Sequence, residues 1–368
     1  MATITPYPRL KNALLAACVA VGLSHCTPQE PSPFQDDWQH YKARFLQHGR
    51  VVDTANQDIS HSEGQGYGML FAVHAQDKSA FRQLWQWTQA VLARDDHLYS
   101  WKYQPCPSRD KACVSDSNNA SDGDILIAWA LLLAAEQWQE PDWQQAALQT
   151  LNAVKSKLIT RRFGHLILLP AEYGFEPDKA RVQLNLSYWV FPALEQFSQQ
   201  TQDPIWHQLY LSGEQLIELA QFGQWHLPPD WVMLTEQGLT LEGALSPDYA
   251  YNACRIPLYI AMSDHGDRAL LTPFLNFWQQ DKVPGTVNLS DNSHADYTMN
   301  SGMQSIATSV QHRYQPHHNH RDSQAQASKS NAENSGVPLP SIDSASDYYS
   351  ASLILLSQLS LLKENPKS

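Results

Sequence analysis

The most informative segment of the chain covers residues 120–138 and reads ASDGDILIAWALLLAAEQW. Two carboxylates, Asp122 and Asp124, stand at its head, and the residues after them are rich in Ala and Leu, without Pro or Gly. Such a composition is typical of a helix that is buried around most of its circumference. Ser121 and Asp122 are residue types that cap helices, so we expect the carboxylates at the mouth of the helix, where its dipole favours their ionised form.

A second acidic helix start covers residues 62–69, reads SEGQGYGM, and leads into an apolar run. Its glycines let the backbone turn tightly and approach a ligand closely. An ordinary first-turn acid would explain Glu63, but it would not explain the glycines or Tyr67. Glycoside hydrolysis requires two carboxyl groups of this kind, one that protonates the leaving oxygen and one that activates water.

These segments and several later ones resemble glycoside hydrolase family 8, the bacterial endoglucanases associated with cellulose synthesis. The matching blocks follow the order found in the family and span about residues 35–360. The block at 120–138 is long and specific, whereas the later blocks are short. The residues that carry the resemblance are Ser62–Met69, Ala120–Trp138, Asn185–Tyr188, Pro229–Val232, Tyr251–Pro257 and Ser346–Tyr349.

The resemblance implies an all-α fold, an (α/α)6 barrel with a small β excursion, and a sugar-binding cleft across one end. It also implies endo-acting hydrolysis of a β-1,4-glucan with inversion at the anomeric carbon, without a metal or another cofactor. Glu63 is then the general acid, and Asp122 contacts the sugar at the cleaved position. Asp124 is placed among the substrate-binding residues. The implied partners are a β-linked polysaccharide and the cellulose-synthase machinery, with the enzyme a monomer.

One position departs from the family. Many members carry Tyr-Asp-Ala-x-Arg where this chain has residues 251–255, and that Asp is the base; here the position is Asn252. An amide cannot accept a proton at useful pH, although some branches of the family carry Asn and draw a carboxylate from elsewhere. We predict Asp248 as the replacement, one helical turn before Asn252, with Arg255 orienting it and Asn252 contacting substrate. Asp230 and Asp347 lie in matching blocks and are assigned to binding.

The composition is compatible with a sugar-binding enzyme. Hydrophobic residues make up 43% of the 368 residues, enough for a substantial core, and the net charge of −12 argues against nucleic acid as a partner. The chain has 12 Trp and 15 Tyr, and ring faces stack on pyranoses, although Trp also fills cores. Trp101 and Tyr188, in or beside polar segments, are the candidates for contact with the sugar.

Residues 1–26 have the features of an export signal. Arg9 and Lys11 precede an apolar stretch, 13–23, that is too short for a stable membrane span. We therefore expect a periplasmic or secreted protein. Cys26 opens a Pro-rich segment as an acylated cysteine would, but His25 stands where a lipoprotein has a small residue, so lipid anchoring is the alternative.

The remaining cysteines fit an oxidising compartment. Cys106 and Cys113 flank a short polar loop, for which we predict a disulfide. Cys254 lies in a predicted helix and is expected to be a small buried residue.

Apolar helical stretches alternate with polar connectors from residue 34 to 363, which predicts one catalytic domain. Strand-like alternation is confined to 163–170 and 231–241. Residues 315–343 are polar and predicted to form a flexible insert, in which His317, His318 and His320 have no further ligand at metal-binding spacing. The predicted helices are 34–48, 66–76, 79–93, 124–138, 142–158, 187–199, 204–221, 250–262, 268–280, 299–312 and 346–363.

Three functions compete at this point. The first is an endo-β-1,4-glucanase. The second is the same fold acting on chitosan, xylan or a mixed-linkage glucan, because net charge does not separate these substrates. The third is a weakly active or non-catalytic glucan-binding protein, because the usual base is replaced by Asn252.

Overall fold

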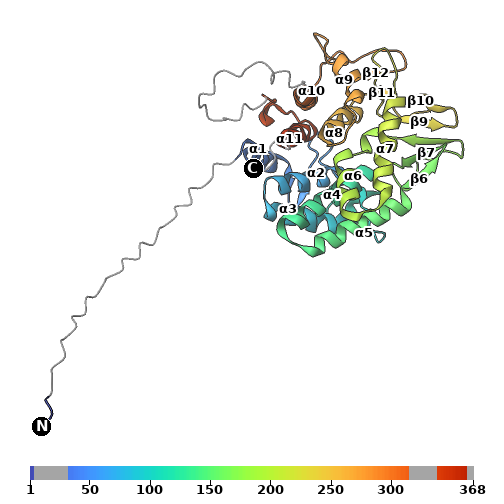
Figure 1. The fold of residues 1–368 in the computed structure, drawn as a ribbon. Helices are drawn as coiled ribbons and strands as arrows, with labels where there is room; N and C mark the ends of the chain where they lie inside the picture. The colour runs from blue at the N-terminus through green and yellow to red at the C-terminus, as the bar shows by residue number, and fades with distance from the viewer. Residues whose placement is uncertain (4–31, 315–337, 363–368) are drawn as a thin grey trace, which may run out of the picture.

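The computed structural model describes residues 1–3, 32–314 and 338–362 (Figure 1). Within these residues it has eleven α-helices, and each overlaps one of the predicted helices. The fold is therefore predominantly helical, as the sequence predicts. The helices are α1 (Pro33–Phe45), α2 (Ser62–His74), α3 (Lys78–Trp87), α4 (Ser121–Trp138), α5 (Pro141–Lys157), α6 (Phe191–Thr201), α7 (Pro204–Leu219), α8 (Ile256–Met262), α9 (Thr272–Phe277), α10 (Ser301–Tyr314) and α11 (Tyr348–Leu362).

The helices fall into two classes by the distribution of their apolar residues. In α4 every residue from Ser121 to Leu132 is buried, and α2, α8 and α11 are also buried on nearly all sides. In α3, by contrast, the buried residues Ala80, Phe81, Leu84 and Trp85 recur at helical spacing and leave the other face to solvent. The first class forms the interior of the domain, and the amphipathic helices cover it.

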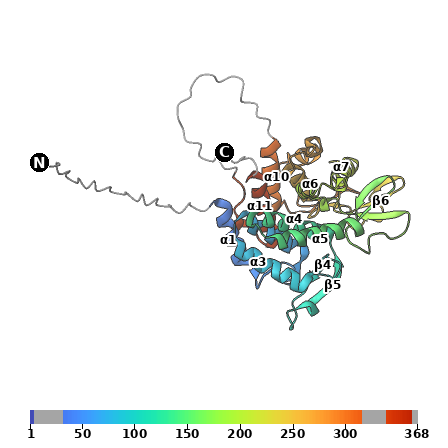
Figure 2. The same ribbon diagram turned by 60° about the horizontal axis from the view of Figure 1, so that its bottom comes forward.

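The packing of the helices follows their order in the chain. Helix α2 packs against α4, α4 against α6, α6 against α8, α8 against α11, and α11 against α2. Outside them, α1 lies on α11, α3 on α2, α5 on α4 and α7 on α6, while α10 contacts α8 and α11. Figures 1 and 2 show α3 and α5 on the outer side of the helical body.

Short antiparallel strands connect the helices. The predicted β excursion is confirmed by β7 (His165–Leu168), β9 (Val232–Thr235) and β10 (Gly238–Thr240). The structure also has strands that the sequence did not predict, some paired with a neighbouring segment and some with a distant one. These are β1 (Leu46–Gln47), β2 (Arg50–Val51), β3 (Ser60–His61), β4 (Ser100–Tyr103), β5 (Val114–Asn119), β6 (Ile159–Arg162), β8 (Arg181–Leu184), β11 (Asp248–Tyr249) and β12 (Val287–Asn288).

One of the small sheets positions the starts of the interior helices α2 and α4. Strands β3, β4 and β5 form one antiparallel sheet, in which His61 pairs with Lys102. Helix α2 begins directly after β3, and α4 begins two residues after β5. This sheet therefore brings the two acidic helix starts to the same end of the domain.

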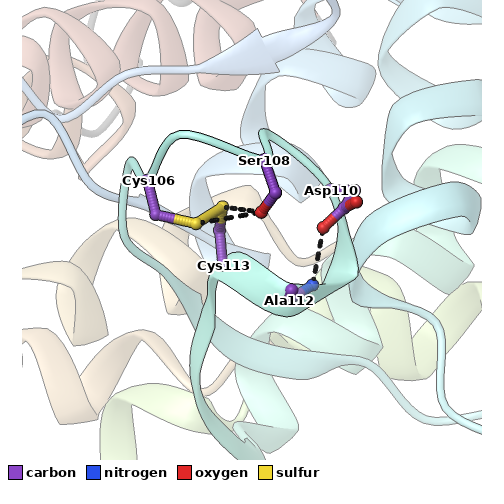
Figure 3. Close-up of a disulfide and its surroundings, with 5 residues drawn as sticks. All are labelled: Cys106, Ser108, Asp110, Ala112 and Cys113. Carbon is purple, nitrogen blue, oxygen red and sulfur yellow. Dashed lines mark hydrogen bonds between the residues drawn. A yellow bond between two sulfur atoms is a disulfide. The ribbon is translucent and has the colours of Figure 1, made fainter.

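The predicted disulfide joins Cys106 to Cys113, with 5.5 Å between the Cα atoms (Figure 3). It closes the loop before β5, and Ser108 Oγ lies 3.2 Å from Cys106 Sγ and 3.3 Å from Cys113 Sγ. Cys254 is a free, buried thiol, as predicted, and donates to the carbonyl of Tyr251 at 3.4 Å.

Two predicted segments lie largely outside the described residues. The export signal is one, and the other is the polar insert with its three histidines. The described chain resumes at residue 338, and a 3₁₀ turn over Ile342–Ser344 buries Ile342. Residues 338–343 of the predicted insert are thus described, whereas residues 315–337 lie outside the described residues. No helix within the described ranges has the length and apolar character that crossing a membrane requires.

Candidate active site

The starts of α2 and α4 meet because glycines face the neighbouring helix. A Cβ on Gly123 would lie 2.1 Å from Ser62 Oγ and 2.9 Å from the Glu63 nitrogen. A Cβ on Gly66 would lie 2.5 Å from Leu126 Cβ. Only glycine permits this approach without displacement of the backbone or its neighbours. Gly66, which lies in the glycine-rich block that the sequence singles out, and Gly123, which the sequence analysis did not single out, thus bring Glu63 and Asp122 into one site.

Glu63 lies in the first turn of α2 with 15% of its side chain exposed. Its Oε1 forms an ion pair with Arg255 Nη1 and accepts a hydrogen bond from the Tyr67 hydroxyl at 3.2 Å. His61, the N-cap of α2, lies 3.9 Å from Oε2 through its Nδ1. The acid is thus held on two sides and remains open to solvent.

His61 fixes the start of α2. Its Nδ1 accepts a hydrogen bond from the Gly64 amide at 3.1 Å, so the ring is neutral and carries its proton on Nε2. Burial and the charge of Arg255 lower the pKa of His61 to about 4. The ring therefore stays neutral over the range in which most enzymes work.

Arg255 connects the groups of the site. Its guanidinium is almost completely buried, and Nη1 donates to the Tyr67 hydroxyl at 3.0 Å. Nη2 donates to Ser187 Oγ at 2.9 Å and to Asn252 Oδ1 at 3.0 Å. Asp122 Oδ2 lies 3.8 Å from Nη1. A single buried cation therefore links the predicted acid, the predicted sugar-binding carboxylate and the position of the family's base.

Asp122 lies in the first turn of α4, and Ala120 is the N-cap, so the prediction of a cap at Ser121 or Asp122 is wrong. The side chain is only 5% exposed and accepts a hydrogen bond from the Gly123 amide at 2.8 Å. Burial raises the pKa of Asp122 to about 7. The expectation that the helix dipole keeps this group ionised is also corrected, because burial outweighs the dipole.

Asp124 is fully buried, and both of its carboxylate oxygens accept hydrogen bonds from the protein. Its Oδ1 accepts from the Tyr99 amide at 2.9 Å, and its Oδ2 accepts from Asn119 Nδ2 at 2.7 Å. Burial raises the pKa of Asp124 to about 8. Its assignment as a substrate-binding residue is therefore corrected: Asp124 ties α4 to the segments around residues 99 and 119.

Asp230 is the carboxylate that contacts Asn252. Asp230 Oδ1 accepts hydrogen bonds from three backbone amides, those of Ala250 at 3.1 Å, Asn252 at 3.0 Å and Ala253 at 2.7 Å. Asp230 Oδ2 lies 3.3 Å from Asn252 Nδ2. The chain turn that carries Asn252 and Arg255 is thus folded around Asp230.

Asp248 does not lie one helical turn before Asn252, as the sequence predicts. The segment before Asn252 is extended: Asp248 lies in β11 and pairs with Asn288 of β12. The helix predicted over 250–262 begins as a 3₁₀ turn at Ala253 and becomes α8 at Ile256. The premise of one helical turn between Asp248 and Asn252 is therefore wrong, and the Asp248 carboxylate accepts instead from Ser246 Oγ at 3.3 Å.

The two predicted aromatic residues are both partly exposed. Trp101 lies on β4 beside Lys102, whose Nζ is 5.4 Å from the centre of its ring. Tyr188 packs edge-on against Trp231 at 6.1 Å, and Phe175 stacks on Trp231 at 5.4 Å with nearly parallel rings. Burial raises the pKa of Tyr188, and the nearby carboxylates of Asp122 and Asp230 raise it further. The Tyr188 hydroxyl therefore lies in the electrostatic field of both carboxylates.

Several residues of the site were not assigned a role from the sequence. Tyr67, Ser187 and Trp231 lie inside the matching blocks, which was a usable signal. His61 precedes a block by one residue, and Tyr259 reaches the Tyr67 hydroxyl at 3.0 Å from α8. Contact with Arg255 or with Tyr67 could not be read from spacing, because the partners are far apart in the chain.

A partly exposed carboxylic acid beside a second, buried carboxylate and a fixed arginine, flanked by aromatic rings, is the arrangement of a glycosidase. The match to the family model for glycosyl hydrolases family 8 covers residues 7–363. The chain belongs to glycosyl hydrolases family 8.

Several similar proteins are endoglucanases. A probable endoglucanase of Novacetimonas hansenii is 35% identical over 344 residues, which cover 92% of this chain and 93% of that protein. An endoglucanase of Cellulomonas uda is 37% identical, with 79% and 82% covered. The solved structure of the endo-β-1,4-glucanase CMCax from Acetobacter xylinum has a TM-score of 0.79 and 35% identity, covering 91% of this chain and 99% of that one.

Proposed function

We propose that this glycosidase is an endo-β-1,4-glucanase that cleaves cellulose chains with inversion. The observation that carries the proposal is the meeting of Glu63 and Asp122 at the contacting starts of α2 and α4, beside Arg255. The endoglucanases among its relatives support the substrate.

In this mechanism Glu63 protonates the glycosidic oxygen as the bond to the anomeric carbon breaks. Its Oε1 contacts Arg255, and its side chain is 15% exposed, so a bound sugar would cover it. Tyr67 holds the orientation of the carboxyl group.

Asp122 holds the sugar ring at the cleaved bond. It is buried beside Glu63, and its ionised form accepts hydrogen bonds from sugar hydroxyls. Trp101, Tyr188 and Trp231 are partly exposed and offer ring faces to neighbouring sugars. These rings extend contact beyond one sugar, which suits an enzyme that cuts within a chain.

We also propose that the helices close into the (α/α)6 barrel. The ring of contacts from α2 through α4, α6, α8 and α11 back to α2 supports closure of the interior layer. The amphipathic helices α1, α3, α5 and α7 each lie on one of these interior helices, which supports an outer layer.

The substrate is tested by measuring reducing ends and viscosity in parallel on carboxymethylcellulose, chitosan, xylan and a mixed-linkage glucan. The proposal expects rapid loss of viscosity and release of reducing ends on carboxymethylcellulose, with lower rates on chitosan and xylan. A higher kcat/KM on chitosan or xylan would change the substrate that we assign but not the proposed mechanism. Binding without release on all four would favour a glucan-binding protein.

Export to the periplasm or the medium remains a proposal, and the disulfide between Cys106 and Cys113 supports it because such bonds persist in oxidising compartments. An enzyme in that location would meet the glucan that a cellulose synthase delivers. Cell fractionation tests the location: activity in the osmotic-shock fluid or medium is expected, and activity confined to the cytosol would contradict it.

A further inference from the structure

The position of the family's base is held by an amide whose orientation is fixed at both ends. Asn252 Oδ1 accepts from Arg255 Nη2 at 3.0 Å, and Asn252 Nδ2 lies 3.3 Å from Asp230 Oδ2. Arg255 has only donors and the Asp230 carboxylate accepts, so the amide oxygen must face the arginine and the amide nitrogen must face Asp230. Asn252 is partly exposed and keeps one N–H for a further acceptor, such as a water molecule.

Asp230 has one oxygen committed to the backbone and one that is less occupied. Its Oδ1 accepts three backbone amides, which fixes the carboxyl plane. Within residues 32–314 and 338–362, its Oδ2 has one hydrogen-bond contact, with Asn252 Nδ2. A carboxylate oxygen accepts about two hydrogen bonds, so Oδ2 retains capacity for a proton or a water.

We propose that Asp230 is the base of the reaction and that Asn252 holds the attacking water against its Oδ2. This assignment rests on the proposed glycosidase function and replaces Asp248. The carboxylate that is missing from position 252 is thus supplied from the loop before β9, one side chain further from the arginine.

The step balances within the site. An O–H bond of the water breaks, its proton moves to Asp230 Oδ2, and the water oxygen forms a bond to the anomeric carbon. The bond between that carbon and the glycosidic oxygen breaks, and Glu63 gives its proton to the leaving oxygen. Asp230 ends protonated and Glu63 ends ionised, and exchange with solvent restores both.

The surroundings of Asp230 suit a base at neutral pH. Burial raises the pKa of Asp230 to about 6, although the three amides and Asn252 act in the opposite direction. The group is therefore mostly ionised at pH 7 and more basic than an ordinary aspartate. Its titratable neighbours Tyr188, Tyr249 and Cys254 have pKa values raised by burial and stay neutral, and the facing cation is Arg255, through Asn252.

The other carboxylates near this end of the domain have different partners. Asp248 Oδ2 accepts from Ser246 Oγ at 3.3 Å. Asp347 accepts from the Ser350 amide at 2.8 Å and from Ser346 Oγ at 2.8 Å, which makes it a cap of α11. Within the described residues, the carboxylate that forms a hydrogen bond with the Asn252 side chain is that of Asp230.

The first test is Asp230→Asn, which keeps an acceptor oxygen for the backbone amides and removes the base. We expect kcat on carboxymethylcellulose to fall about 10²–10⁴-fold, the usual contribution of general base catalysis, with KM nearly unchanged. β-Cellobiosyl fluoride, whose leaving group needs no proton, separates acid from base. Glu63→Gln should retain most of its hydrolysis, whereas Asp230→Asn should not.

Added sodium azide distinguishes the loss of a base from structural damage, because azide can replace the activated water but cannot repair a misfolded site. Azide needs no base, so in the Asp230→Asn enzyme it should attack β-cellobiosyl fluoride and form the α-glycosyl azide. Formation of this product supports the assignment. A folded Asp230→Asn enzyme with kcat near that of the wild type would overturn it, as would a loss of activity that azide does not restore.

An exchange of the two side chains gives the second test. Asn252→Asp alone places two carboxylates in contact, so its turnover should stay level or fall. The double variant Asp230→Asn with Asn252→Asp restores one carboxylate and one amide, and it should recover much of the activity lost in Asp230→Asn. A rise in kcat from Asn252→Asp alone would contradict the proposal, because it would show that the wild-type site lacks a base.

Asp248→Asn provides the competing arm, since it neutralises a carboxylate of the same type four residues before Asn252. We expect it to retain turnover, and abolition of turnover in a folded Asp248→Asn enzyme would return the base to that residue. If the wild type hydrolyses none of the polysaccharides or the fluoride, the glycosidase function fails. If it hydrolyses them and Asp230→Asn does so equally well, the assignment of the base alone fails.

Discussion

The contact between the starts of α2 and α4 predicts a large effect from one methyl group. In Gly123→Ala the new Cβ would lie 2.1 Å from Ser62 Oγ, 2.6 Å from Ser62 Cβ and 2.9 Å from the Glu63 nitrogen. All three separations are shorter than ordinary van der Waals contact, so the two helix starts must separate or tilt. Overpacking of this kind costs about 1–3 kcal/mol.

The same displacement moves the acid relative to Asp122 and Arg255. A misplacement of about 1 Å in an active site can cost on the order of 10² in rate. We therefore expect Gly123→Ala to lower kcat on carboxymethylcellulose by roughly 10²-fold. Its thermal midpoint should fall by several degrees, since each kcal/mol shifts the midpoint of a large domain by about 2–4 °C.

A compensating variant distinguishes the clash with Ser62 from a non-specific loss of stability. Ser62 Oγ is buried and has no hydrogen-bond partner in the part of the chain that the structure describes, so its removal sacrifices no hydrogen bond seen there. Adding Ser62→Gly to Gly123→Ala removes both side-chain atoms nearest the new methyl group. The double variant should regain part of the midpoint and of kcat. If Gly123→Ala alone keeps both the wild-type midpoint and the wild-type kcat, the close approach of the helix starts does not control the site.

Further predictions concern the carboxyl groups and the disulfide. Glu63→Gln removes the transferable proton and should lower kcat on polysaccharide about 10²–10⁴-fold; wild-type turnover would end its role as acid. Asp122→Asn should impair turnover in a folded enzyme, and unchanged kcat would leave it a structural residue. Because burial raises the pKa of Asp124 to about 8, well above that of an ordinary aspartate, the folded state binds its proton more tightly than the unfolded state. The unfolding free energy should therefore fall as pH rises from about 4 to about 8, and Asp124→Asn should flatten this dependence in chemical denaturation. Cys106→Ser should lower the thermal midpoint while leaving KM nearly unchanged, and an equal midpoint would remove the stabilising role of the disulfide.

The interior helices could be predicted from the sequence because their composition is apolar on every side. The run after Asp124 and the run after Gly68 fit no other environment, and local composition was sufficient to identify them. The glycines at the start of α2 were also informative, whereas Gly123 was given no role. The contacts of Gly66 with Leu126 and of Gly123 with Ser62 required the structure, because they join residues from different helices.

The misassignment of Asp124 has a simple geometric cause. Residues two apart on a helix are separated by about 200° around its axis, so Asp122 and Asp124 point to opposite sides. Asp122 faces Arg255, whereas Asp124 faces the Tyr99 amide. The spacing was visible in the sequence and would have excluded a shared site for the pair.

The misplacement of Asp248 had a cause that the sequence did not display. Strand β11 exists because it pairs with β12, about 40 residues further along the chain. A two-residue strand has no periodicity of its own, and tertiary pairing overrides the helical pattern that follows it. The contact between Asp230 and Asn252 likewise depends on this long-range folding.

The stereochemistry of the first product tests the mechanism most directly. Proton NMR of the wild-type enzyme on a β-1,4-linked cello-oligosaccharide follows the anomer released before mutarotation. An acid at Glu63 with a base that activates water on the opposite face predicts that the α-anomer appears first. Initial release of the β-anomer would contradict the account, because retention requires a covalent intermediate on a carboxylate in place of a water-activating base.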